Sequence, residues 1–194
     1  MQTIRKLIKL SLTSMLIFSF SSAQELDEKT KYELVTLSDK SIGKVAGQLQ
    51  MALLKKAKEG GIAHAATFCS TNATSLAKEA SKSLNAGVSL KRITSKPRNM
   101  KNLANEEQVE ILKQLQKSYE KTGKIETLVK QKSENHFQVY KPIIVMAKCL
   151  ECHGDKSFRN KEAYEIISKK YPQDKAIDYK LYDFRGAFLV NIIK

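Results

Sequence analysis

Two cysteines separated by two residues and followed at once by a histidine lie late in this chain, as Cys149-Leu150-Glu151-Cys152-His153. Thiols at positions i and i+3 can add to the two vinyl groups on one edge of a porphyrin, and the next residue then lies under the iron as an imidazole ligand. A chain built in this way must fold around a flat macrocycle. The motif therefore predicts one covalently bound c-type haem, attached through Cys149 and Cys152, with His153 as an iron ligand.

Two other interpretations of the cysteine pair fit less well. A zinc site would need two further ligands, and the sequence has neither a second such pair nor a His-x3-5-His pair to supply them. A thioredoxin-type redox pair would begin a helix after a core strand, and that role does not account for the adjacent His153. Zinc binding and thiol exchange stay open as alternatives.

The first 23 residues have the three parts of a secretory signal peptide: a basic start, an apolar run over 10–20, and small residues at 21–23. No later stretch is apolar over the roughly 18 residues that a membrane span needs. We expect cleavage after Ala23 and a soluble, periplasmic mature chain over 24–194 that forms a single domain. Because c-type haem is attached after export, the signal and the motif predict the same compartment.

Lysine dominates the charge of this chain. It has 34 Lys and Arg against 20 Asp and Glu, and loss of Arg5, Lys6 and Lys9 with the signal lowers the formal net charge from +14 to +11. Lysine-rich surfaces are mostly solvated, and they can also steer acidic proteins or anionic membranes. We expect a redox partner protein of acidic character, and no nucleic acid because the chain is exported.

Hydrophobic periodicity and turn residues predict three helices and three strands. The pair Gly60-Gly61 is expected to end the first helix, and the second begins directly after it. The expected helices cover 37–58, 62–84 and 105–119, and the expected strands cover 88–94, 136–145 and 184–193.

The iron ligand opposite His153 determines what such a haem can do. All five Met precede the motif, at 1, 15, 51, 100 and 146, which disfavours the small electron-carrying cytochrome c, whose Met ligand follows it. The chain also continues over 154–194 into an expected strand, which disfavours the four-helix cytochromes. The remaining candidate ligands are Cys69, His64, His136 and Met51.

Cys69 has the most favourable position of these four. It lies in the apolar stripe of the second helix between Ala66 and Ala73, whose small side chains let a flat macrocycle approach. His64 lies about 140° further around the helix, where a solvated histidine is the simpler interpretation. His136, at the start of a strand, stays an alternative ligand, and Cys69 can equally be a small buried hydrophobe.

Five segments of the chain match a known pattern: 65–69, 92–99, 149–154, 171–176 and 185–187. In these segments the chain resembles a family of exported monohaem c-type proteins with a PAS-like domain, long classed as a domain of unknown function. The resemblance implies an α+β fold with a PAS-like antiparallel sheet, long N-terminal helices around it and the haem between helices and sheet. It also implies that Cys69 is the thiolate ligand opposite His153. Met100 and Asp178 depart from the pattern, in which Pro and Gly usually stand.

A thiolate ligand would stabilise ferric iron and lower its potential. On reduction Cys69 could take up a proton and leave, which would open a site for CO or NO. These properties fit a redox or small-ligand sensor that is not an enzyme. The alternative is a simple electron-transfer carrier, and sulfur-compound oxidation is disfavoured by the single motif. Arg92, Arg98 and Arg185 are candidate partners for the haem propionates, with surface or turn roles as the alternative.

Overall fold

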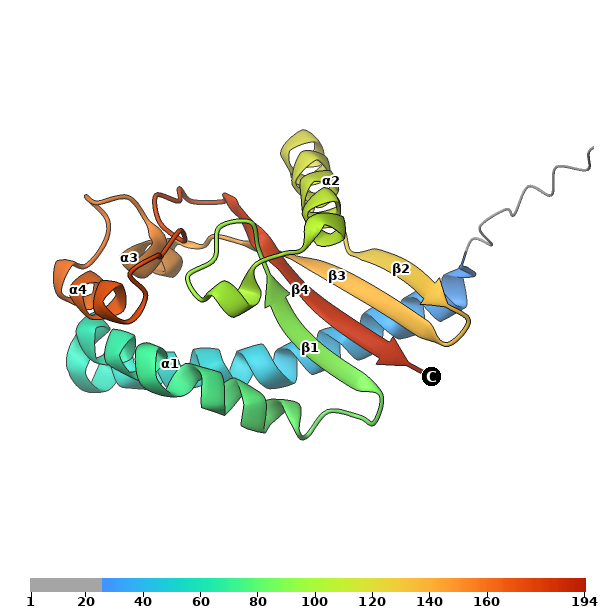
Figure 1. The fold of residues 1–194 in the computed structure, drawn as a ribbon, viewed down its shortest axis with the longest axis horizontal. Coiled ribbons are helices and arrows are strands. Elements are labelled where there is room, and N and C mark those ends of the chain that lie inside the picture. Colours follow the sequence, from blue (N-terminus) through green and yellow to red (C-terminus); the bar gives the residue numbers. More distant parts are fainter. Residues whose placement is uncertain (1–25) are drawn as a thin grey trace, which may run out of the picture.

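The structure, a computed structural model, describes residues 26–194, and the signal predicted over 1–23 lies outside them. A four-stranded antiparallel sheet with the order β1-β4-β3-β2 forms its centre (Figure 1). The strands are β1 (Val88–Ile93), β2 (Leu128–Ser133), β3 (His136–Ile144) and β4 (Phe184–Ile193). Long helices pack around this sheet, which confirms the predicted α+β fold with an antiparallel sheet.

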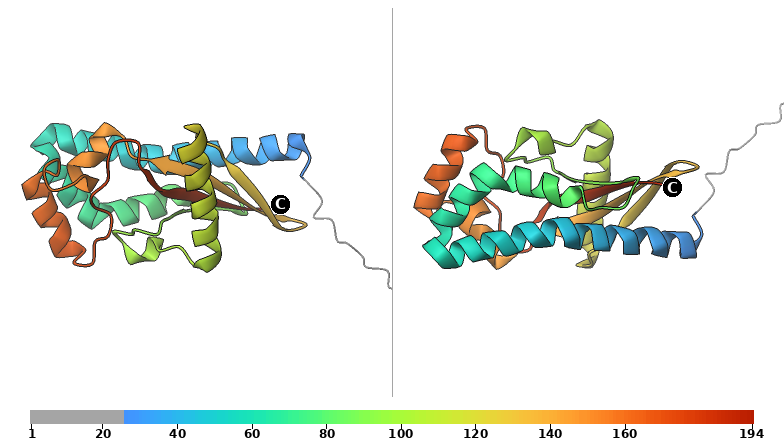
Figure 2. Two further views of the ribbon diagram at one scale, coloured as in Figure 1. Left: turned by 90° about the horizontal axis from the view of Figure 1, so that it is seen from above. Right: turned by 90° about the horizontal axis from the view of Figure 1, so that it is seen from below.

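The two faces of the sheet are covered by different helices, because successive residues of a strand point to opposite sides. Val190 of β4 pairs with Val139 of β3 and Leu90 of β1, and it lies in the apolar cluster that contacts Leu34 of α1 (Glu28–Ser81). The neighbouring Leu189 lies in the other cluster, which includes α2 (Glu106–Thr122). The views from above and below show the sheet between these two helices (Figure 2).

The predicted break between the first two helices is present as a sharp turn inside α1. Gly60 (φ −152°, ψ 23°) and Gly61 (φ 78°, ψ −176°) are both non-helical. The two halves of α1 therefore run back side by side, and the Lys44 ammonium of the first half donates to the Ser83 carbonyl just after the second (Figure 2). The turn lies beyond the end of the sheet, where the second half of α1 packs against α4 (Lys161–Lys170) (Figure 1).

Several predicted boundaries were wrong. The first helix begins at Glu28 rather than near residue 37, because Asp27 caps it and Leu34 is fully buried against the sheet. The second half ends at Ser81, three residues before the predicted end. The third helix was predicted at the right place; Asn105 caps it in a capping box with Gln108, and it runs on to Thr122 before Gly123.

The longest elements that the sequence prediction missed are the edge strand β2 and the helix α4. The strand predicted over 184–193 matches β4, and the one over 136–145 ends one residue early in β3. Within residues 26–194, none of the helices is both long and apolar enough to cross a membrane.

Candidate functional site

The cysteine motif follows strand β3, at the end of the sheet that lies nearest the turn in α1. The chain leaves β3, passes through a short turn η2 (Ala147–Cys149) and forms the single helical turn α3 (Leu150–His153). Residues three apart on a helical turn lie on the same side, so Cys149 and Cys152 present their thiols together. Both thiols are free and half-buried, as the addition chemistry predicted for this motif requires.

His153 is held as a neutral imidazole with a defined tautomer. Its Nδ1 lies 2.7 Å from the carbonyl oxygen of Ala176, an acceptor only, so Nδ1 carries the proton and Nε2 keeps its lone pair. Burial lowers the pKa of His153 well below its ordinary value, and the positive charges of Arg98 and Arg185 lower this pKa further. The Tyr179 ring lies nearly perpendicular to the imidazole, with centroids 6.4 Å apart. His153 is thus a half-buried, neutral imidazole with a free Nε2, which is the form that ligates a metal ion.

Cys69 is brought to the same end of the molecule as the motif. It lies one turn from Ala66, which forms a buried cluster with Ala163 and Ile167 of α4, and the half-buried Cys152 packs against this cluster. Burial raises the pKa of the Cys152 thiol, and the neighbouring Cys69 adds to this rise in pKa. Cys69 is itself half-buried and free of any disulfide. The structure therefore groups the thiol predicted as a ligand with the predicted attachment site.

The three candidate arginines gather near His153, but their surroundings differ. Each of their positive charges lowers the pKa of His153. Arg92 is an exposed residue of β1. Arg185 donates to the Thr94 hydroxyl at 2.8 Å and lies over the Tyr179 ring at 5.2 Å. Arg98 already binds a carboxylate and a carbonyl, whereas Arg185 has no carboxylate within ion-pair distance among residues 26–194.

The other candidate ligands lie away from this group. His136 starts β3 at the end opposite the motif, where its ring is 3.4 Å from the Asn191 side chain. The nine-residue strand from His136 to Ile144 spans roughly 25 Å. His64 is exposed, as its simpler interpretation predicted.

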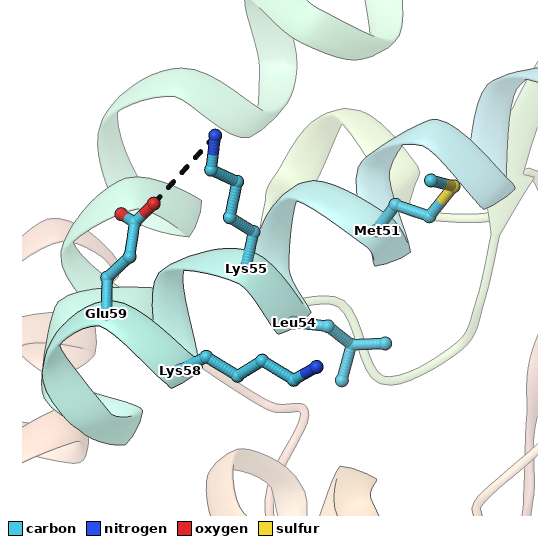
Figure 3. Close-up of a pocket in the computed structure, with 5 residues that line it drawn as sticks. All are labelled: Met51, Leu54, Lys55, Lys58 and Glu59. Atoms are coloured by element: carbon cyan, nitrogen blue, oxygen red, sulfur yellow. Dashed lines mark ion pairs between the residues drawn. The ribbon is translucent and has the colours of Figure 1, made fainter.

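Met51 lies on the exposed surface of α1. Its side chain is 72% exposed on the outer face of α1, at a shallow hollow of about 390 Å³ that Leu54, Lys55, Lys58 and Glu59 complete (Figure 3). Lys55 and Glu59 form an ion pair across one side of this hollow, at 3.9 Å. Met51 therefore belongs to the surface of the helix.

The sequence prediction assigned no role to the segment 174–179, which forms one wall of the site. Ala176 supplies the carbonyl that accepts from His153, and Tyr179 supplies the ring beside it. The backbone of this segment also pairs with the motif, since the Tyr179 amide donates to the His153 carbonyl at 3.0 Å. The sequence held a partial signal for this segment, because the overlapping residues 171–176 are among those that carried the family resemblance. Within residues 26–194, no three His, Cys, Asp or Glu side chains are arranged to hold a metal ion by themselves.

The fold and this site define an α+β protein in which a Cys-x-x-Cys-His turn, a helix thiol and three arginines meet beside an antiparallel sheet. The chain belongs to the Tll0287-like family, whose model matches residues 4–192. It is also similar in fold to a solved structure described as the crystal structure of the cyanobacterial heme-protein Tll0287. The TM-score is 0.58 at 21% sequence identity, over 87% of this chain and 98% of the other. No match was found among the curated proteins.

Proposed function

We propose that this protein is an exported, monohaem c-type haem protein that acts as a sensor of redox state or of a small ligand such as CO or NO. The similar solved protein is described as a heme-protein, and this chain shares its family name and its fold. The observation that supports the proposal most directly is the state of His153. A neutral imidazole, fixed through Nδ1 and free at Nε2, directly follows two free thiols.

The residues at the site fit the parts of a haem c. Cys149 and Cys152 would form the two thioether bonds, and His153 would bind the iron through Nε2. Cys69 is the thiol available on the facing helix. Arg185 and Arg92 provide positive charge for the propionates. When bound, the haem supplies an iron that exchanges one electron and accepts an axial ligand.

The position of Cys69 in the fold supports the sensor role. The second half of α1 packs on α4 through a small apolar cluster around Ala66 and Ile167, and its end is tied to the first half by Lys44. Release of Cys69 from the iron would remove one link between this half-helix and the motif while leaving its contacts with α4 in place. A bond between Cys69 and the iron that forms in one redox state and is lost in the other can shift the second half of α1 between two positions. A partner protein could detect this shift. The lysine-rich surface favours an acidic partner.

Covalent attachment is tested first, by mass spectrometry of the protein exported from cells that mature c-type haems. We expect the mass of the chain without residues 1–23 plus one haem, and loss of that haem in a Cys149→Ser/Cys152→Ser variant. An apo mass from cells that load a control cytochrome would refute the haem assignment.

Sensor and carrier are then distinguished by the reaction of the ferrous protein with CO. A sensor that releases Cys69 on reduction binds CO readily, and the Cys69→Ala variant binds it at a similar rate. A simple electron carrier keeps both ligands, because small reorganisation favours electron transfer, so the wild type stays inert while Cys69→Ala binds CO. The second pattern would assign the protein to electron transfer instead.

A further inference from the structure

Arg98 and Asp174 form a buried ion pair beside the cysteine motif. The Arg98 Nε donates to Asp174 Oδ2 at 2.9 Å, and the two side chains are only 12% and 2% exposed. In every other ion pair among residues 26–194 at least one partner is 38% exposed or more. An ion pair that is buried on both sides is costly to desolvate, so its hydrogen-bonding partners show what it holds in place.

These partners all belong to the backbone that surrounds His153. The Arg98 Nη2 donates to the Cys152 carbonyl at 2.6 Å and approaches the Ala176 carbonyl at 3.5 Å. The second oxygen of Asp174, Oδ1, accepts from the Ala176 amide at 2.8 Å. Ala176 is thus held from both sides, and its carbonyl accepts the Nδ1 proton of His153 at 2.7 Å.

We propose that Arg98 and Asp174 are positioning residues for His153, and that Arg98 serves this role instead of binding a haem propionate. The inference rests on the proposed function, in which His153 ligates the iron. A carbonyl that accepts the Nδ1 proton sets the plane of the imidazole and raises the basicity of Nε2. Arg98 and Asp174 fix that carbonyl relative to Cys152, and therefore relative to the attachment site itself.

The geometry of Arg98 separates it from the other two arginines. Its Nε and Nη2 both donate to acceptors of the protein, so the Nε/Nη2 edge of the guanidinium, one of its two edges that can hold a carboxylate through two hydrogen bonds, is already used. Among the side chains of residues 26–194, Arg185 contacts the Thr94 hydroxyl and the Tyr179 ring but has no carboxylate within ion-pair distance. The propionates are thereby left to Arg185 and Arg92.

The ion pair between Arg98 and Asp174 also joins two segments that are distant in the sequence. Arg98 lies in the segment 92–99 and Asp174 in 171–176, two of the segments on which the family resemblance rested. The Lys175 amide donates to the Pro97 carbonyl at 3.0 Å, so the two segments also meet through their backbones. Their common contact is the motif turn.

The test compares two variants of the holoprotein with two matched controls. Asp174→Asn removes the charge without changing the shape, and Arg98→Lys keeps the charge but loses the planar fork. The controls are Asp39→Asn, which removes the charge from an ion pair with Lys141 on the sheet, and Arg159→Lys, since the Arg159 side chain is also largely buried and makes no hydrogen bond to Ala176 within residues 26–194. For each protein the haem content, the stability to denaturant, the ferric EPR g values and the midpoint potential are measured.

We expect both variants to keep one haem while their g values shift and their potentials become more positive, because a weaker Nδ1–H···O bond makes Nε2 a poorer donor to ferric iron. The controls should keep wild-type g values and potential whatever their stability. If Asp174→Asn does not fold, Arg98→Lys decides alone.

Wild-type g values and potential in Arg98→Lys and in a folded Asp174→Asn would reduce the pair to a purely structural role and overturn the inference. A wild-type protein without haem would instead refute the proposed function, so the two failures are distinguishable.

Discussion

At the scale of single residues, Asp178 adopts a backbone conformation that suits glycine. Its φ is 61°, in the left-handed region, at the position where the resembling family commonly has Gly. A side chain at such a position costs about 1 kcal/mol relative to glycine. Asp178 in place of the usual Gly therefore adds a small local strain. The fold accepts it because Asp is one of the residues that tolerate this region.

We predict that Asp178→Gly is more stable than Asp178→Ala by about 1 kcal/mol. Both substitutions remove the carboxylate that lies 3.9 Å from Arg159, so the difference between them isolates the backbone. Urea unfolding of the two variants measures it. Equal stabilities would mean that the segment relaxes to another conformation at this position.

Cys69 allows a second prediction at this scale. Cys69→Ala should convert a low-spin ferric spectrum with thiolate features into a high-spin or differently ligated one, because the other two cysteines of the chain belong to the motif. Ser70→Ala is the matched control: this neighbour is buried on the same helix, and its hydroxyl has no hydrogen-bond partner within residues 26–194. An unchanged spectrum in Cys69→Ala would return Cys69 to a packing role.

The residues of the motif could be predicted because their chemistry depends on spacing along the chain, as with Cys149, Cys152 and His153. Cys69 was found from its helical stripe together with the resemblance. Asp174 and Ala176 received no role, because their contacts with Arg98 and His153 join parts of the chain more than 20 residues apart. No local pattern encodes such a contact.

At the scale of elements, the turn in α1 depends on Gly61. Its φ of 78° is unfavourable for any residue with a Cβ, although a Cβ would meet no atom within 4 Å. We predict that Gly61→Ala lowers the free energy of unfolding by about 1 kcal/mol. Gly43→Ala is the control: it lies inside the helical part of α1 in open space, and alanine there should stabilise the protein by about 0.5–1 kcal/mol. Thermal unfolding of both variants tests the opposite signs.

The two longest elements that sequence reasoning missed differ in the local signal that they carry. In β2, Leu128–Lys130 are half-buried and the last three residues are exposed, so its alternation is weak. Helix α4 does carry a local signal that the prediction did not use, since Asn160 caps it and Ala163 and Ile167, four residues apart, both pack with Ala66 of α1. By contrast, β4 was predicted with its exact bounds, and half of its residues are buried.

At the scale of the whole molecule, the apolar contacts are unevenly divided. The two faces of the sheet are packed by large side chains, among them Tyr140, Leu189 and Ile111 on one side and Leu34 and Val190 on the other. The end that holds the motif is packed by smaller clusters, around the alanines 66 and 163 with Ile167 and around Val145 with Ala176. Since stabilisation scales with the apolar area buried, we expect the sheet to stay folded without haem more readily than the end that holds the motif.

This division predicts the behaviour of a protein that cannot attach haem. In Cys149→Ser/Cys152→Ser, amide hydrogen exchange should stay slow in β3 and β4 and become fast in α4 and the segment 174–179, because local opening reflects local burial. Cys69→Ala, which keeps both attachment thiols, should retain protection in α4. Equal loss of protection in sheet and α4 would show one cooperative unit. Full protection in α4 without haem would show that the protein packing there suffices, and the ligand-linked movement proposed for the sensor would then need another cause.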